Sequence, residues 1–254
     1  MAMYHLSVKY VSRRKGQSVV AAAAYRSGER LYDERYGQTY DFTKKVGIIH
    51  REILLPPDAP RAFSDRAMLW NEVERSEKRC DSRLTREVEI ALPSELTTQE
   101  RIQLAKEYAE NSFVKLGMCA DVAVHDKGCG NPHAHILLTT HRVQKDGFEV
   151  KERGWDKKQN VEHWRKAWAD IQNHIYEQKG IKQRVSHESH AARGIAREPT
   201  IHLGYLTKEL EREGIETERS NRYRAIVTRN KRRVEHKRQQ ERIYKHQRNQ
   251  ERSR

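Results

Sequence analysis

Five short stretches of the chain are rich in apolar and β-branched residues and predict strands. The first of them alternates apolar and polar side chains with a period of two. The second is followed by the proline-rich sequence PPDAP, which predicts a loop after this strand. The last two are joined by the glycine-containing sequence DKGCGNP, so we expect neighbouring strands there. The five predicted strands cover residues 3–12, 45–55, 86–93, 121–125 and 133–141.

The segments between and after these strands have helical patterns. Ser18 is a predicted N-cap for a helix that runs through four alanines to Tyr25, with Gly28 near its end. The chain from Arg219 onward is predicted to be a long, mostly polar helix or a tail that orders on binding. Other predicted helices cover residues 61–77, 94–113 and 161–180, with shorter ones at 187–194 and 205–214.

The order of these elements indicates the fold class. Strands interleaved with helices, mostly returning by long connections, predict an α+β fold in which helices cover a mainly antiparallel five-stranded sheet. A chain of 254 residues with 36% apolar residues is large enough to bury such a core. The three scattered cysteines (Cys80, Cys119 and Cys129) form no CxxC pair, which argues against a disulfide framework or a thiolate metal site.

No feature of the sequence points to a membrane. No apolar run approaches the roughly 20 residues that cross a bilayer, and MAMYHLSVKY lacks the apolar region of a secretory signal. We therefore expect a cytoplasmic protein without membrane insertion.

Positive charge is concentrated at the C-terminal end. The formal net charge is +14, of which the segment from Arg219 contributes +11. Lysine and arginine that neutralise phosphates release counterions, so this balance favours a polyanionic partner such as nucleic acid, although such runs can also be merely solvated. We expect this segment to bind a nucleic-acid backbone through Arg222, Arg224, Arg229, Lys231, Arg232 and Arg233.

Histidines form the first candidate chemical cluster. In NPHAHILL, His133 and His135 flank one alanine, and a strand would place both rings on the same face. His125 closes the preceding strand, so antiparallel pairing can bring it beside them as a third metal ligand. His141 shares the face but lies roughly 20 Å from His135 along a strand, too far for one ion. A surface histidine pair without a metal is the alternative.

Carboxylates and tyrosines supply the other candidates. Glu87 and Glu89 share one face of the strand REVEIALP, where a carboxylate can accept a proton from a histidine ligand or from a nucleophile. An exposed strand face is the alternative for both. Tyr25 is the candidate nucleophile. Tyr32, Tyr36 and Tyr40 compete with it, and Tyr32 would share its helical face if the helix continued past Gly28.

The N-terminal sequence MAMYHLSVKYVSRRKGQSVVAAAAYRSGE, together with REVEIALP and HDKGCGNPHAHILL, resembles the MobA/MobL (MOBQ-type) conjugative relaxases of the HUH endonuclease superfamily. The resemblance continues through KAWADIQNHIYEQKGI and the HxxHxxxGI and PTIHLG segments to about residue 204. It implies the HUH relaxase fold, a central antiparallel sheet flanked by helices. It also implies that Tyr25 is the nucleophile, that His125, His133 and His135 bind a divalent metal, and that Glu87 supports a histidine or the nucleophile.

The resemblance further implies a reaction. Tyr25 would attack one phosphodiester of single-stranded DNA at a plasmid origin of transfer, leaving a 5′-phosphotyrosine adduct and a free 3′-hydroxyl, with religation after conjugative transfer. Mn²⁺ or Mg²⁺ would assist. The expected partners are this single strand and its adjacent hairpin or duplex, with accessory relaxosome proteins and a coupling protein as further candidates. We expect a relaxase domain over residues 1–204 and a helical, basic DNA-binding segment over residues 205–254.

Two other functions fit the same residues. One is a rolling-circle replication initiator with the same chemistry, and the other is a DNA-binding relative that has lost activity. No role is assigned to His187, His190 or His202, and Glu89 remains a second choice beside Glu87. A chain that stops within a basic helical segment is also consistent with a truncated longer protein.

Overall fold

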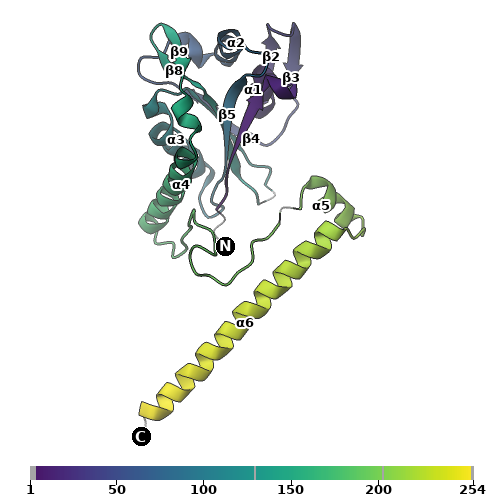
Figure 1. Cartoon of the computed structure of the whole chain (residues 1–254), viewed down its shortest axis with the longest axis vertical. Coiled ribbons are helices and arrows are strands. Elements are labelled where there is room, and N and C mark those ends of the chain that lie inside the picture. Colours follow the sequence, from purple (N-terminus) through teal and green to yellow (C-terminus); the bar gives the residue numbers. More distant parts are fainter. Residues whose placement is uncertain (1–3, 129, 202, 253–254) are drawn as a thin grey trace. The chain divides into compact units, whose positions relative to one another are not determined.

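The computed structural model describes residues 4–128, 130–201 and 203–252 (Figure 1). Cys129 and His202 lie outside the described residues. The chain forms two compact units, Met1–His187 and Glu188–Arg254. The boundary expected at 204/205 therefore falls inside the second unit. Among the described residues, no helix combines the length and apolar character that crossing a bilayer requires.

A five-stranded sheet organises the first unit. Its strand order is β1-β5-β7-β6-β4, and all four neighbouring pairs are antiparallel. The predicted α+β fold with an antiparallel five-stranded sheet is thus confirmed. The strands are β1 (Leu6–Ser12), β4 (Ile48–Leu54), β5 (Arg83–Ala91), β6 (Ala120–His125) and β7 (His133–Thr139).

Two small hairpins were not predicted. They are β2 (Arg30–Asp33) with β3 (Gln38–Asp41), and β8 (His141–Gln144) with β9 (Gly147–Lys151). Their strands are only four or five residues long and carry many charged or polar residues, so the hydrophobic pattern is weak. One predicted strand was also too long. The chain leaves β7 at Thr139, and His141 belongs to β8.

Helices cover both faces of the sheet. On one face, α3 (Thr98–Ser112) and α4 (Lys158–Gln178) lie side by side (Figure 1). Val88 and Ile90 of β5 share a buried core with Trp164 and Trp168 of α4. The opposite face packs against α1 (Val19–Ser27) and α2 (Arg66–Ser76) at one end. Single turns of 3-10 helix occur at Arg13–Lys15, Arg61–Ser64, Val114–Leu116 and Arg153–Asp156.

The alanine run lets α1 approach its neighbours closely. Ser18 caps the helix by accepting from Ala21 N at 3.0 Å, and Ala23 and Ala24 are fully buried. Gly28 ends it with φ +66°, a left-handed conformation that favours glycine. A Cβ at this position would clash with Ile48 Cδ1 of β4. Small residues therefore bring the end of α1 against the sheet.

The described part of the second unit forms two helices, α5 (Tyr205–Arg212) and α6 (Glu218–Arg252). The predicted long polar helix is confirmed by α6. The short helix predicted at 187–194 is wrong, because this segment forms turns. Its bonds run from Arg193 N to Ser189 O and from Ile195 N to His190 O, and Gly194 at φ +64° ends the turn before a helix can extend.

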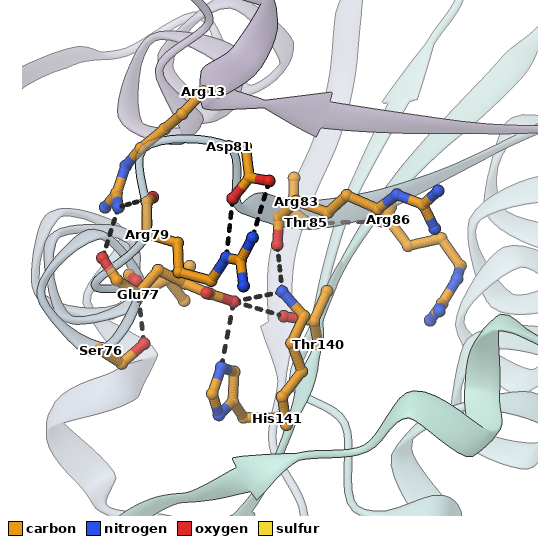
Figure 2. Close-up of polar contacts among 12 residues, drawn as sticks. Arg13, Ser76, Glu77, Arg79, Asp81, Arg83, Thr85, Arg86, Thr140 and His141 are labelled. Carbon is orange, nitrogen blue, oxygen red and sulfur yellow. Dashed lines mark hydrogen bonds and ion pairs between the residues drawn. The ribbon is translucent and has the colours of Figure 1, made fainter.

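A buried ion cluster ties the β8–β9 hairpin to the sheet (Figure 2). Glu77 follows α2 and contacts His141 Nε2 at 3.1 Å and Lys151 Nζ through the same carboxylate oxygen. His141 Nδ1 donates to Glu149 O at 2.7 Å. Burial alone raises the pKa of Glu77, but hydrogen bonds from His141 and Lys151 outweigh it and lower the pKa to about 2. The cluster thus depends on an ionised Glu77.

We expect Glu77→Gln to lower the free energy of unfolding by about 3 kcal/mol, because it leaves the partly buried Lys151 ammonium without its counterion. Urea denaturation at pH 7 measures this loss. The depressed pKa stabilises the fold above pH 4.5 and less so as the pH falls toward 2, so the difference between wild type and variant should shrink over that range. Glu72→Gln breaks only an exposed α2 pair with Arg75 and should cost less than about 1 kcal/mol. Equal losses in the two variants would contradict the role of the cluster.

Candidate active site

The structure brings His125, His133 and His135 together at one end of the sheet. His125 ends β6 and pairs directly with His133, the first residue of β7. His135 follows two residues later on the same face. The three ring centroids lie 4.8 to 5.3 Å apart, and one ligand atom from each ring lies within 4.8 Å of the others. The rival His141 instead lies in the Glu77 cluster.

Each of these histidines binds a protein oxygen through one ring nitrogen. His135 Nδ1 donates to Glu87 Oε1 and His133 Nδ1 donates to Asn131 O, both at 2.8 Å. His125 Nε2 donates to Arg26 O at 2.7 Å. These bonds fix the tautomers and leave the second nitrogen of each ring available to bind a metal ion.

Burial favours the uncharged form of two of these rings. It lowers the pKa of His125 to about 4, and it also lowers the pKa of His133 below its usual value. Neutral imidazole is the form that binds metal. The donor set therefore fits a divalent metal ion.

Glu87 lies on β5, the strand that pairs with β7, and only 4% of its surface is exposed. Besides His135, it accepts two bonds from Arg26, at 2.7 Å from Nε and 2.6 Å from a terminal nitrogen. Burial raises its pKa, but the bonds from His135 and Arg26 outweigh this and lower it to about 2. Glu89 points to the same face but pairs with Lys9 at 2.6 Å. Of the two glutamates, Glu87 is the one bonded to the triad.

Tyr25 lies in the last turn of α1, with 49% of its surface exposed. Its ring lies perpendicular to the Phe42 ring, with the two centroids 5.2 Å apart. Lys45 Nζ lies 3.7 Å from the centroid of the Tyr25 ring. Tyr32 does not share its helical face, because α1 ends at Ser27 and Tyr32 lies on β2. Gly28 thus separates the two tyrosines.

Arg26, the neighbour of Tyr25, links α1 to the triad in two ways. Its carbonyl accepts from His125, and its guanidinium binds Glu87, which in turn holds His135. Neither interaction was predicted, since both join residues far apart in the chain. Lys45 was likewise missed: it fell at the start of a predicted strand, but β4 begins only at Ile48.

The basic residues expected to contact DNA lie along α6. Acidic neighbours in the same unit already pair with three of them: Arg224 contacts Glu216 at 2.8 Å, and Arg229 and Arg233 contact Glu198 at 2.7 and 2.9 Å. The other three are exposed, and no ion pair is recorded for them within the described part of the chain; they are Arg222, Lys231 and Arg232. His187 and His190 lie on either side of the unit boundary, and no chemical role is assigned to them.

Comparison with known proteins gives consistent matches. The model of the MobA/MobL family matches residues 17–213. Mobilization protein MobL of Acidithiobacillus ferridurans is 39% identical over 246 residues, which cover 84% of this chain and 64% of that protein. Conjugal transfer protein TraA of Agrobacterium fabrum is 35% identical over 255 residues, covering 86% of this chain and 23% of that protein. The chain thus spans less than two thirds of the length of these relatives.

A solved structure has a similar fold. It is described as "Molecular Basis of Vancomycin Resistance Transfer in Staphylococcus aureus" and is 39% identical in sequence. The match has a TM-score of 0.70 and covers 74% of this chain and 100% of that chain.

Proposed function

Because the chain belongs to the MobA/MobL family, we propose that it is a conjugative relaxase that nicks one DNA strand at a plasmid origin of transfer. The single observation that best supports this is the double link through Arg26, which joins the helix of Tyr25 to two of three clustered histidines. A nucleophile attached rigidly to a metal-binding cluster suits phosphodiester chemistry.

In this proposal Tyr25 is the nucleophile. Its Oη forms a bond to the phosphorus of the scissile phosphodiester as the bond from phosphorus to the 3′ oxygen breaks. The phenol loses one proton and the 3′ oxygen gains one, so the reaction needs no further reactant. The product is a 5′-phosphotyrosine and a free 3′-hydroxyl, and reversal rejoins the strand.

His125, His133 and His135 would hold a divalent metal ion. When bound, the ion would act as a Lewis acid on a phosphate oxygen and stabilise the charge that develops there. Three imidazoles favour a transition metal, so we expect Mn²⁺ to support the reaction better than Mg²⁺. Glu87 would keep His135 in the tautomer that leaves its second nitrogen free, and Arg26 would hold Glu87 ionised.

The proposed partner is single-stranded DNA with an adjacent hairpin, held partly by α6. Phosphate contacts position a protein without specifying bases. The exposed cations Arg222, Lys231 and Arg232 are the ones to test.

We expect the triple change Arg222→Gln, Lys231→Gln and Arg232→Gln to weaken the salt dependence of DNA binding. The slope of log K against log salt should decrease by about 0.7 to 0.9 for each phosphate that the protein no longer neutralises. Fluorescence anisotropy with a labelled hairpin carrying a single-stranded arm measures this slope between about 50 and 300 mM salt. The matched control removes three exposed charges from α4 (Lys158→Gln, Arg165→Gln and Lys166→Gln). If the slopes of both variants equal that of wild type, α6 does not bind the backbone.

A denaturing gel tests the function itself. The protein is incubated with a labelled oligonucleotide that spans a candidate origin of transfer, with Mn²⁺, with Mg²⁺ or with EDTA. The expected result is a metal-dependent band in which DNA stays attached to protein. Cleavage without attachment would make water the nucleophile and contradict the proposal. A band formed only with a replication origin would reassign the protein to replication initiation.

A further inference from the structure

Lys45 contacts Tyr25 in two places. Its Nζ lies 3.7 Å from the centroid of the Tyr25 ring. The same ammonium donates to the Tyr25 carbonyl at 2.7 Å. Phe42, from the same loop, meets the ring edge-on. The loop between β3 and β4 therefore contacts Tyr25 through a cation above its ring and through an aromatic ring that lies perpendicular to it.

This loop is anchored at both ends. Asp41 accepts from Thr43 N and Oγ1 at 3.0 and 2.7 Å, and Lys45 N donates to Phe42 O at 2.9 Å. At the other end, Gly47 O accepts from Asp126 N at 2.8 Å, just after His125. Gly47 has φ +87°, and a Cβ there would meet Lys127 Cγ at 2.5 Å. The loop thus holds Lys45 in place against the connection between β6 and β7, next to His125.

The ammonium group of Lys45 is partly buried and lies near two other cations. Burial, together with the neighbouring cations Arg26 and Lys127, lowers the pKa of Lys45 to about 8, while Glu87 acts in the opposite direction. The side chain remains mostly protonated at neutral pH. Ion pairs to carboxylates hold Lys9 and Lys151, whereas Lys45 makes its hydrogen bond and its cation–π contact with Tyr25.

We propose that Lys45 is a positioning residue that fixes the Tyr25 ring and, through its positive charge, stabilises the negative charge that develops on Oη as the phenol loses its proton during attack. A cation over an aromatic face attracts the ring, and the attraction grows as negative charge develops on the reacting oxygen. The inference rests on the proposed function for its role in DNA cleavage. Its effect on Tyr25 itself can be measured without DNA or metal.

Acetylation of tyrosine by N-acetylimidazole measures that effect, because the reagent reacts at Oη. Trypsin places Tyr25 in residues 16–26 and Tyr32 in residues 31–35, so mass spectrometry follows each separately. We expect Lys45→Met to slow acetylation of Tyr25 by about 3- to 30-fold and to leave Tyr32 unchanged. Lys45→Arg keeps the charge and should largely restore the rate. Lys44→Met removes an exposed neighbouring charge and should have no effect. An unchanged Tyr25 rate in Lys45→Met would overturn the proposal.

Single-turnover cleavage at varied DNA concentration separates positioning from phosphate binding. We expect Lys45→Met to lower the rate of adduct formation at saturating DNA by a similar factor, with the half-saturating DNA concentration unchanged. A raised half-saturating concentration with an unchanged maximal rate would assign Lys45 to DNA binding and overturn the proposal. Urea denaturation of each variant checks that the fold is intact. If wild-type protein forms no adduct, the proposed function fails, whereas the acetylation result still decides whether Lys45 acts on Tyr25.

Discussion

Tyr25→Phe is expected to reduce formation of the covalent protein–DNA adduct by at least about 10³-fold, because it removes the only atom that would attack phosphorus. The change deletes one oxygen from a half-exposed side chain and leaves the ring contacts to Phe42 and Lys45 available. The DNA dissociation constant should therefore stay within about twofold of the wild-type value. A denaturing gel for the adduct and anisotropy for binding measure the two quantities.

Tyr32→Phe is the matched control. Tyr32 is exposed to a similar degree, 53% against 49%, but lies on β2 and has no recorded cation over its ring among the described residues. Its adduct formation should match wild type. Persistent adducts in Tyr25→Phe, or their loss in Tyr32→Phe, would move the nucleophile away from Tyr25.

Loss of one triad histidine is expected to have the second-largest effect. His133→Ala removes one of the three proposed ligands. The recorded hydrogen bond of this side chain goes to Asn131 O, so the Glu87–Arg26 network stays intact. Isothermal titration calorimetry with Mn²⁺ should show at least about a 100-fold loss of affinity, since even a partner of a metal ligand is typically worth 10- to 100-fold. Metal-dependent adduct formation should fall with it.

His50→Ala provides the comparison for this variant. His50 lies on β4 in the same sheet but bonds Glu52, which also pairs with Lys106 of α3. Its removal should leave Mn²⁺ affinity unchanged. If His133→Ala bound Mn²⁺ as tightly as wild type, the histidine cluster would not be the metal site.

Local patterns predicted the scaffold of the site well. The N-cap at Ser18, the alanine helix and Gly28 follow from residues within one or two helical turns. The pairing of His125 with His133 follows from strand period and a short connection. These features depend on neighbours in sequence, which is why the sequence alone could place them.

Interactions between distant segments could not be predicted in the same way. The carbonyl of Arg26 that binds His125 carries no sequence signal, because every residue has a carbonyl. Lys45 reaches Tyr25 only after the β2–β3 hairpin turns the chain back toward α1. The number of charges along α6 likewise could not show that Arg229 pairs with Glu198 and Arg224 with Glu216, because both glutamates lie outside this helix. Packing, not periodicity, decides these features.

The most direct test of the central claim is to identify the residue that carries DNA after reaction. Wild-type protein is incubated with Mn²⁺ and an oligonucleotide spanning a candidate origin of transfer, then digested with trypsin and nuclease and examined by mass spectrometry. The proposal predicts a nucleotide phosphate on Tyr25, within residues 16–26, which contain no other tyrosine. Attachment within residues 31–35 or 36–44, or cleavage with no attached nucleotide, would contradict Tyr25 as the nucleophile.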